Sequence, residues 1–394
     1  MSRSISIFGA TGSVGASTLD LIRSNRDDWR VVALTANTAT DDLADLAREF
    51  DAEIAIVADE GAGQALEAAL AGASIQAAAG AAALCEAARR PVDMTVAAIV
   101  GCAGLAPTMA AIEQGGSVAL ANKEALVSAG DVMTAAVARS GATLLPVDSE
   151  HNAIFQCLAA NRIEDVARIT LTASGGPLRE CNAAELAAVT PEQAVAHPNW
   201  DMGAKISVDS ATMFNKGLEL IEAHHLFPVG LDRIDIVVHP QSVIHSMVEY
   251  RDGSTLAQLG PPDMRVPIAS CLAWPQRMAT DCAPLDLPTL GQLTFHAPDE
   301  ERFPATRIAR ECAAAGGASP AVMNAANEVA VAAFLDGKLA FNDIAVTVSE
   351  TLQTGSFDAP ATLDDVLALD KEARRIAGRI TTSRANRLDG VASL

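Results

Sequence analysis

The feature that most constrains the fold is a glycine-rich turn near the N-terminus, placed between a strand and a helix. Residues 5–8 read ISIF and suit a short, mainly apolar strand, residues 9–15 read GATGSVG, and residues 16–24 carry apolar side chains at helical spacing. Glycines at such a turn let the backbone approach a pyrophosphate at the N-terminus of the helix. The spacing departs from the strict GxGxxG pattern, and a tight turn without a ligand is the alternative. Its place on the first strand-to-helix turn favours a nucleotide site.

The chain repeats the order of strand and helix up to about residue 145. Strands are predicted at residues 29–34, 52–58, 94–99 and 117–120, and helices at 63–71, 80–89, 105–114 and 124–139. Alternating strands and helices with glycine turns predict a parallel, doubly wound sheet.

The segment after the second strand bears on the choice between NAD and NADP. It contains no Asp or Glu to accept from a ribose 2′-hydroxyl, which favours NADP. The Arg or Lys that would hold a 2′-phosphate is also missing from residues 35–40. Asn37, Thr38 and Thr40 offer hydrogen-bond donors instead, so the cofactor choice stays open at this point.

Polar residues follow two further strands, where open α/β sheets place their ligands. Residues 121–124 read ANKE, and residues 146–152 read PVDSEHN. Asp148 and Glu150 would repel each other unless a cation lies between them, and a hard divalent cation is the usual solution. The alternative is an ordinary turn in which Asp148 or Ser149 caps the next helix. Lys123 is a candidate for polarising a substrate oxygen or binding an anion, because cations are disfavoured at a helix N-terminus.

A helix predicted over residues 210–225 separates polar from apolar side chains. One stripe of this helix carries the polar side chains of Thr212, Asn215, Lys216 and Glu219. A different face carries the apolar side chains of Phe214, Leu218 and Ile221. A surface ion pair of little energetic consequence is one interpretation of Lys216 and Glu219. The other is that Asn215 and Lys216 hold an anionic substrate group while Glu219 adds a third carboxylate to a metal.

Other segments carry weaker signals. Residues 174–177, SGGP, offer backbone N–H groups for an anion, although a simple loop is the alternative. Residues 197–203, with one of three Trp residues, suit either a lid or an anchored loop. Residues 242–250 and 255–259 alternate like a hairpin that could serve a dimer interface. Helical periodicity from residue 303 predicts a small helical bundle.

Composition excludes several classes of protein. The net charge is −21, from 28 basic and 49 acidic residues, which disfavours nonspecific binding to nucleic acid or anionic membrane. Seven scattered Cys without a CxxC motif indicate free thiols in a reducing compartment. The sequence contains no signal peptide and no apolar run that could span a bilayer. We therefore expect a cytoplasmic enzyme with no nucleic-acid or membrane partner.

Taken together, these segments resemble one family nearly end to end. The matching segments are GATGSVG (9–15), ANKE (121–124), PVDSEHN (146–152), SGGP (174–177), HPNW (197–200), ISVDSAT (206–212) and NKGLE (215–219). The chain is similar to the 1-deoxy-D-xylulose 5-phosphate reductoisomerases, the NADPH-dependent enzymes of the non-mevalonate isoprenoid pathway that fosmidomycin inhibits. The resemblance implies an α/β fold and a homodimer. Its expected parts are an N-terminal Rossmann-like domain (1–145), a central α+β catalytic domain (146–280), a linker (281–302) and a C-terminal helical bundle (303–394).

The resemblance also implies roles for individual residues. The metal ligands for Mg²⁺ or Mn²⁺ would be Asp148, Glu150 and Glu219. The catalytic residues would be Lys123 and Glu150, with Ser149 contacting the oxygenated end of a phosphorylated sugar and Glu150 moving protons. The phosphate would be held by Ser174, Ser210, Asn215 and Lys216, with His197 beside them. The NADPH site would be lined by Thr11, Gly12, Ser13, Val14, Asn122, Glu124 and Gly203, to which we add Asn37.

One departure from the family pattern concerns residues 37–39. The family often shows Gly, then Lys or Ser, then Asn after the second strand, whereas this chain has Asn37-Thr38-Ala39. The resemblance implies rearrangement of the substrate to an aldehyde, by retro-aldol and aldol steps or by a 1,2-shift, followed by hydride transfer to give 2-C-methyl-D-erythritol 4-phosphate. Two alternatives remain: another dehydrogenase on the same architecture, such as a homoserine or aspartate-semialdehyde dehydrogenase, or a dinucleotide sensor without catalysis.

Overall fold

The chain divides into two compact units, each of which is described by itself. The structure, a computed structural model, describes residues 2–200 and 202–392, with side chains up to residue 385. The first unit comprises residues 1–125, 133–152 and 263–282, and the second comprises residues 126–132, 153–262 and 283–394. The domain boundaries predicted at residues 145, 280 and 302 stay predictions.

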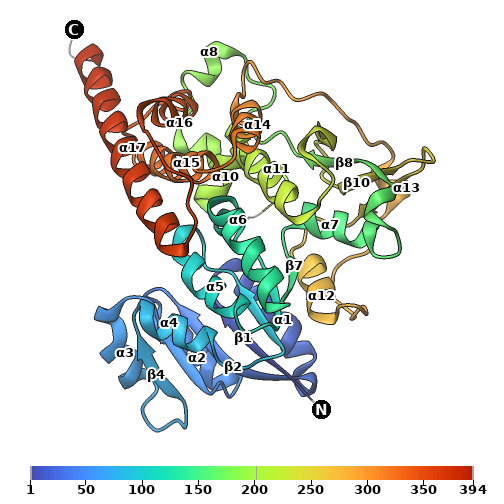
Figure 1. The fold of residues 1–394 in the computed structure, drawn as a ribbon, viewed down its shortest axis with the longest axis vertical. Helices are drawn as coiled ribbons and strands as arrows, with labels where there is room; N and C mark the ends of the chain where they lie inside the picture. The colour runs from blue at the N-terminus through green and yellow to red at the C-terminus, as the bar shows by residue number, and fades with distance from the viewer. Residues whose placement is uncertain (1, 201, 393–394) are drawn as a thin grey trace. The chain divides into compact units, whose positions relative to one another are not determined.

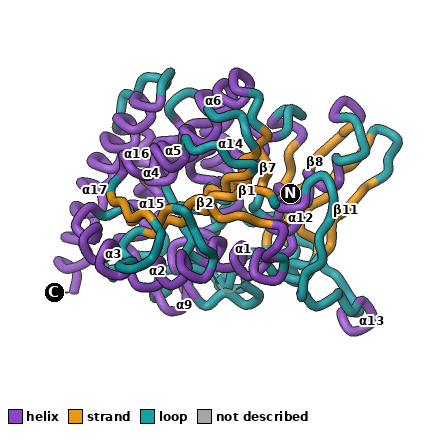
Figure 2. The backbone as a smooth tube through the Cα atoms, turned by 90° about the horizontal axis from the view of Figure 1, so that it is seen from below, coloured by secondary structure: helices purple, strands orange, loops and turns teal. Residues whose placement is uncertain are grey.

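A seven-stranded parallel sheet forms the centre of the first unit, in the order β4-β3-β2-β1-β5-β6-β7. The strands are β1 (Arg3–Phe8), β2 (Trp29–Ala36), β3 (Ile54–Val57), β4 (Gln76–Ala79), β5 (Met94–Ala97), β6 (Ser117–Leu120) and β7 (Thr143–Pro146). Strands β3 and β5 are buried along their whole length, and β1, β2 and β6 at all residues but one, as expected for a parallel sheet covered on both faces. Strands β1 and β2 run side by side in Figure 2. The strand order reverses between β1 and β5, and such a switch point is where open α/β sheets bind ligands.

Helices connect these strands, as the alternating pattern predicted. The connecting helices are α1 (Ser13–Ser24), α2 (Thr40–Glu49), α3 (Gly63–Ala69), α4 (Ala81–Ala88), α5 (Leu105–Ile112) and α6 (Lys123–Ser140). Helix α7 (Ser149–Leu158) follows β7, and α12 (Arg265–Ala273) comes much later in the chain. The sequence did not predict α2, β4 or α12. The short β4 consists of Gln and three Ala, which carry little strand preference, so its pairing with β3 decides its conformation.

The second unit combines a mixed sheet with a set of helices. Its strands are β8 (Val166–Ala173), β9 (Ile234–Val238), β10 (Ile244–Tyr250) and β11 (Thr255–Leu259), in the order β11-β10-β8-β9. Strands β10 and β11 form the predicted hairpin. The helices are α8 (Ala183–Leu186), α9 (Pro191–Val195), α10 (Ala204–Thr212), α11 (Phe214–Leu226), α13 (Leu287–Leu290), α14 (Ala305–Ala315), α15 (Ser319–Leu335), α16 (Asp343–Thr354) and α17 (Leu363–Ala392). Helices α10, α11, α14 and α15 lie close together around one apolar core (Figure 1).

The single helix predicted over residues 210–225 is wrong. Helix α10 ends at Thr212, Met213 adopts a left-handed conformation (φ 67°), and α11 starts at Phe214. The local sequence does not predict this break, because residues 212–214 contain neither Gly nor Pro. Packing explains it: Phe214 is fully buried, and an added Cβ at Gly217 would lie 2.8 Å from the Ala309 side chain of α14. Thr212 therefore belongs to a different helix from Asn215, Lys216 and Glu219, which remain together on α11.

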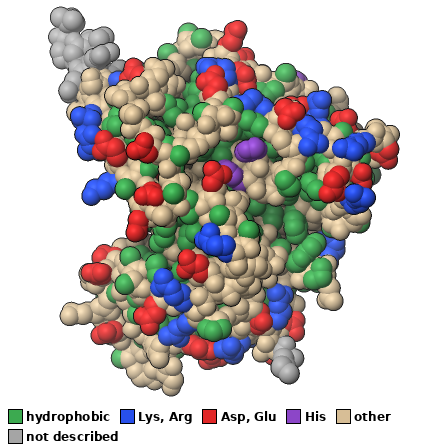
Figure 3. All heavy atoms as spheres, viewed as in Figure 1, with side chains coloured by type: hydrophobic (Ala, Val, Ile, Leu, Met, Phe, Trp, Pro, Cys, Tyr) green, Lys and Arg blue, Asp and Glu red, His purple; other side chains and the backbone are tan. Residues whose placement is uncertain are grey.

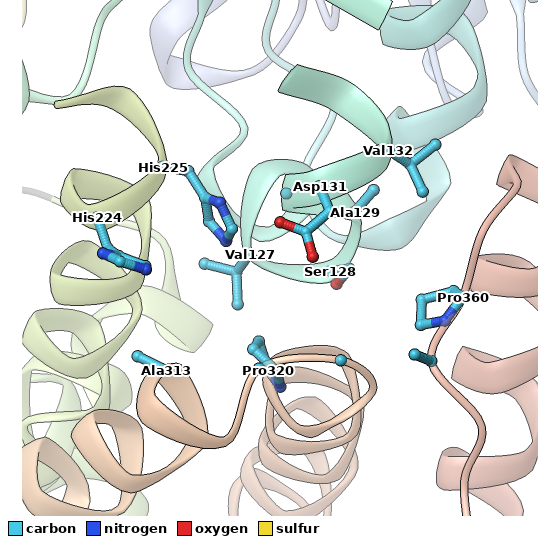
Figure 4. A pocket seen from close by; sticks show the side chains of 14 residues that line it. Val127, Ser128, Ala129, Asp131, Val132, His224, His225, Ala313, Pro320 and Pro360 are labelled. Carbon is cyan, nitrogen blue, oxygen red and sulfur yellow. The ribbon is translucent and has the colours of Figure 1, made fainter. Parts of the chain in front are cut away.

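Helix α6 is kinked at Ala129 (φ −128°, ψ 24°). In the second unit, this kink faces the end of α11 and the start of α15 across a cavity of about 90 Å³. Figure 4 shows Asp131, His224 and His225 directed into that space. A Cβ at Gly130 would lie 2.1 Å from the His225 ring, so the glycine is needed for the ring to pack against α6.

Candidate active site

The glycine turn between β1 and α1 is shaped by close backbone packing. Gly9 has φ +90°, and an added Cβ there would lie 2.6 Å from the carbonyl oxygen of Ala98. A Cβ at Gly15 would lie 2.2 Å from the Gly9 oxygen, whereas one at Gly12 would meet that oxygen only at 3.4 Å. Gly12 is the exposed N-cap of α1, and its helix has no side-chain cap. The N–H groups of this first turn, which includes Ser13 and Val14, therefore suit a phosphate.

The other residues predicted at the nucleotide site in the first unit differ in exposure. Asn37 is exposed at the end of β2, and Thr11 is partly exposed in the glycine turn. Asn122 is buried and caps α6, because its side chain accepts from the Ala125 N–H (3.0 Å). The Asn122 amide also donates to the Gly101 oxygen (2.9 Å) in the loop that follows β5. Asn122 therefore shapes the loop at the switch point, an assignment that sequence reasoning missed.

A buried lysine and two carboxylates follow neighbouring strands of the first unit. Strands β6 and β7 pair in parallel, so the residues after them lie next to each other at one edge of the sheet. Lys123 is 5% exposed and forms an ion pair with Asp148. Its charge at the start of α6 would otherwise be unfavourable, because the helix dipole repels a cation there. The Ser149 hydroxyl donates to Glu150 in the first turn of α7 (2.5 Å), and the His151 ring lies 3.8 Å from Asp148.

The third predicted metal ligand, Glu219, belongs to the second unit and is completely buried on α11. The amide of Asn215 donates to one carboxylate oxygen (2.6 Å), and the ammonium group of Lys216 donates to the other. Lys216 is itself only 3% exposed. A weak surface ion pair, the alternative that the sequence left open, is therefore wrong.

The loop after β8 contains the predicted anion-binding residue Ser174, which is bonded to His197 (Oγ to Nε2, 2.9 Å). The backbone N–H groups of Asn199 and Trp200 both donate to Nδ1 of His197 (3.2 and 3.0 Å). Nδ1 must then be unprotonated, so in the neutral ring Nε2 carries the hydrogen and donates to Ser174. Ser174 Oγ also accepts from the Gly176 N–H (3.1 Å), which leaves its own hydroxyl hydrogen available to an anion.

Burial lowers the pKa of His197 from its ordinary value near 6.5. The two backbone N–H groups that donate to Nδ1 also lower the pKa of His197, because protonation of Nδ1 would place a hydrogen against both of them. The imidazole is therefore held neutral, in the tautomer that orients Ser174.

The same loop also packs against the end of α10. Gly176 has φ +70°, and an added Cβ would lie 2.7 Å from the Ser210 oxygen and 2.8 Å from Ala211 Cα. Ser174 and Ser210 therefore lie on segments that pack against each other, and α11 with Asn215 and Lys216 begins shortly after Ser210. Hydroxyl, amide, ammonium and glycine N–H groups are donors that suit a phosphate.

The segment predicted as either a lid or an anchored loop is held in place here. Asn199 donates to the Pro240 oxygen (2.6 Å), and the Trp200 ring lies 6.0 Å from the His245 ring. His245 was not among the predicted residues, since strand alternation does not say which ring a loop will contact. Gly203 caps α10 in open space, with no atom within 4 Å of an added Cβ.

These features define a class of protein. The first unit is a dinucleotide-binding α/β domain with polar residues at its switch point and sheet edge. The second unit contains hydroxyl, amide and ammonium donors and a buried carboxylate. Such a combination is typical of an oxidoreductase that acts on a small phosphorylated substrate.

Comparison with known proteins identifies the family. The family model of 1-deoxy-D-xylulose 5-phosphate reductoisomerase matches residues 5–130, and two models of its C-terminal domains match residues 144–227 and 259–376. The reductoisomerase of Zymomonas mobilis is 59% identical over 381 residues, covering 97% of this chain and 98% of the relative. That of Afipia carboxidovorans is 55% identical, covering 96% and 94%. The chain belongs to the 1-deoxy-D-xylulose 5-phosphate reductoisomerase family.

Solved structures agree with this assignment. The Z. mobilis enzyme in complex with NADPH has a TM-score of 0.93 at 58% identity, covering 97% of this chain and 100% of that one. A reductoisomerase in complex with NADPH, fosmidomycin and magnesium has a TM-score of 0.92 at 43% identity, covering 98% and 99%. The predicted family and fold class are confirmed.

On the face shown in Figure 3, basic and acidic side chains are interspersed. Among the described helices, none combines the length and apolar composition needed to cross a membrane.

Proposed function

We propose that the protein catalyses the NADPH-dependent isomerisation and reduction of 1-deoxy-D-xylulose 5-phosphate to 2-C-methyl-D-erythritol 4-phosphate, in the non-mevalonate isoprenoid pathway. The observation that carries this function is family membership over nearly the whole chain. Because of this family membership, we reject both alternatives, a different dehydrogenase and a dinucleotide sensor without catalysis.

The cofactor is NADPH, which supplies the hydride. The open N-terminus of α1 after the Gly9 turn supports a pyrophosphate site, with Thr11, Gly12, Ser13 and Val14 around it. Asn37, Asn122, Glu124 and Gly203 complete the proposed cofactor set. Asn37 is exposed after β2, and we propose that it donates to the 2′-phosphate.

Asp148, Glu150 and Glu219 are the proposed ligands of Mg²⁺ or Mn²⁺. All three offer only carboxylate oxygens, which hard divalent cations prefer. Asp148 and Glu219 are largely buried, and each forms an ion pair with a lysine ammonium group. The bound cation would polarise the substrate carbonyl and stabilise the charge that develops on its oxygen.

The residues of the chain divide the work at the substrate. Ser174, Ser210, Asn215 and Lys216 hold the phosphate, and His197 keeps the Ser174 hydroxyl oriented. Lys123 places its positive charge next to the reacting oxygens and stabilises negative charge there. Glu150, which accepts a hydrogen bond from Ser149, moves the proton between substrate oxygens. Binding energy from the phosphate orients the reacting end.

Oxidation of NADPH tests this function directly. Purified protein with Mg²⁺ or Mn²⁺ and 1-deoxy-D-xylulose 5-phosphate should lower the NADPH absorbance, and EDTA should stop the reaction until metal is restored. A folded, metal-loaded protein that leaves NADPH unchanged would contradict the proposal.

The protein is also proposed to be a homodimer that associates through the sheet of the second unit. Strand β11 is an edge strand, and its Leu256 and Leu259 are 44% and 37% exposed. Exposed apolar residues on an unpaired edge favour association. Light scattering should give twice the monomer mass, and Leu256→Glu with Leu259→Glu should shift the protein towards the monomer. A wild-type protein that stays monomeric at assay concentration would refute this.

The proposed compartment is the cytoplasm. None of the seven cysteines, which all lie among the described residues, forms a disulfide, and this suits a reducing compartment. Cell fractionation with an antibody against the protein checks this assignment, and recovery in a membrane or secreted fraction would refute it.

A further inference from the structure

The polar face of α15 has no role in the function proposed above. Most of this helix is Ala, Val and other apolar residues, yet Asn324 and Asn327 are completely buried. Buried amides are unfavourable unless they are hydrogen-bonded. Asn324 donates to Ser128 (3.3 Å) and Glu328 (3.1 Å), whereas Asn327 donates to the Asp209 carboxylate (2.7 Å). The two amides therefore contact different helices.

Asp209 lies in the last turns of α10 and is 1% exposed. Its second oxygen forms an ion pair with Lys205 (2.7 Å), one turn earlier on the same helix. A carboxylate only accepts hydrogen bonds, so the NH₂ group of Asn327 must face it and the amide orientation is fixed. Helices α10 and α15 lie side by side in Figure 1.

The two partners of Asp209 act differently on α10. Lys205 belongs to α10 itself, so its ion pair cannot fix how this helix is rotated against the rest of the unit. Asn327 belongs to another helix, and its bond to Asp209 does fix that rotation. Replacing a buried polar pair by apolar packing often costs no stability. The contribution that is specific to this bond is therefore the orientation of α10, rather than the stability of the fold.

The rotation of α10 matters for the phosphate site. Ser210 follows Asp209 directly, and the Ser210 oxygen and Ala211 Cα form the surface on which the Gly176 turn packs. After Met213 the chain enters α11, which carries Asn215 and Lys216. A small rotation of the last turn of α10 would therefore move the phosphate-binding groups relative to one another.

We propose that Asn327 is a positioning residue, which acts through Asp209 to hold the end of α10, and with it the phosphate-binding segments, in register. This inference rests on the proposed function, because it assigns the same site a support from the C-terminal helices. It predicts a defect in phosphate binding rather than in the chemical step.

The test compares two equally buried amides one helical turn apart. Asn327→Leu should raise KM for 1-deoxy-D-xylulose 5-phosphate about tenfold and leave kcat within about threefold, since misplaced binding groups mainly weaken binding. Its dissociation constant for inorganic phosphate, measured by calorimetry, should rise in parallel. Asn324→Leu removes an amide that does not contact α10, so its KM and its dissociation constant for phosphate should stay within about twofold of the wild type.

Each outcome decides the inference. Equal effects of the two variants, or a phosphate dissociation constant unchanged in Asn327→Leu, would overturn it. If Asn327→Leu does not fold, Asn327→Ser, which removes the same amide with less bulk, is measured in its place. Phosphate calorimetry on folded protein needs no turnover, so it decides this point even if the wild type fails to oxidise NADPH and the proposed function is lost.

Discussion

Two lysine–carboxylate pairs in which both side chains are largely buried, Lys216–Glu219 and Lys123–Asp148, arise in different ways. Lys216 and Glu219 are three residues apart on α11, so helix geometry alone makes them neighbours. Lys123 and Asp148 are far apart in sequence and meet because β6 and β7 are adjacent and parallel. The first pair depends on local structure and the second on sheet topology. Their proposed roles also differ, since Lys216 holds the phosphate and Lys123 acts at the reacting oxygens.

The largest expected effect comes from Glu219, the buried carboxylate of the local pair. Glu219→Gln keeps the shape of the side chain but removes a metal ligand, so we expect kcat to fall by about 10³-fold with the far-UV circular dichroism spectrum unchanged. The matched control is Glu311→Gln on the exposed surface of α14, which should keep full activity. Near-normal turnover of Glu219→Gln would remove this residue from the metal site.

The next effect separates the two lysines. We expect Lys123→Met to lower kcat about 100-fold with a smaller change in KM, because its charge is needed where negative charge develops. We expect Lys216→Met to raise KM for the phosphorylated substrate at least tenfold with a smaller change in kcat. Steady-state kinetics of both variants measure this contrast, and the same pattern in both would contradict the assignment of separate roles.

A stability measurement sharpens the same comparison. Loss of Lys123 leaves the Asp148 carboxylate buried without its ion pair, which should cost about 3 kcal/mol of unfolding free energy in the metal-free protein. Added Mg²⁺ should restore part of this loss, because it binds the folded state. Urea unfolding with and without Mg²⁺ provides the values. A Lys123→Met variant that is as stable as the wild type without metal would show that this ion pair does not stabilise the metal-free protein.

A smaller effect concerns pH. The pKa of His197 is lowered by burial, so the folded state binds this proton less readily than the unfolded state. Its contribution to stability is present above pH 6.5 and is lost as the pH falls through the lower folded-state pKa. We expect KM to stay constant down to pH 6.5 and to rise only below it. Nitrogen NMR should find the hydrogen on Nε2, and a His197 pKa at or above 6.5 would refute the proposed tautomer network.

The smallest effect is on thiol reactivity, with one buried cysteine compared in each unit. Burial raises the pKa of Cys271 in the first unit to about 12, and that of Cys312 in the second unit to about 12. Both thiols should resist alkylation at pH 8 and react only after local opening, because the thiolate is the reactive form. Mass spectrometry of labelled peptides measures the two rates, and rapid labelling of either cysteine in the folded protein would contradict its burial.

Some features of the site followed from short-range patterns in the sequence. The glycine turn after β1, the carboxylates after β7 and the stripe of Asn215, Lys216 and Glu219 were all identified from spacing. Strand alternation likewise predicted the hairpin of β10 and β11. These features depend on φ/ψ preferences and on periodicities of 2 and 3.6 residues, which a sequence shows directly.

Other features escaped sequence reasoning for a common reason. The break at Met213 carries no Gly or Pro and is decided by burial of Phe214 and by the close approach of Gly217 to α14. The C-terminal helices were predicted, but the bond from Asn327 to Asp209 joins residues far apart in the chain. Periodicity identifies the face of a helix that is polar, and it does not identify the partner of that face.

The sequence by itself determined the parallel sheet, the nucleotide turn, the family and the residue types at each part of the site. The tertiary structure alone decided that Lys123 neutralises Asp148, that the ring of His197 fixes the hydroxyl of Ser174, and that the turn at Gly176 rests on the end of α10. Secondary structure and motifs depend on interactions between residues near in the chain, which leave a pattern in the sequence. Charge pairing, tautomer choice and close backbone contact depend on which distant residues are brought together by packing.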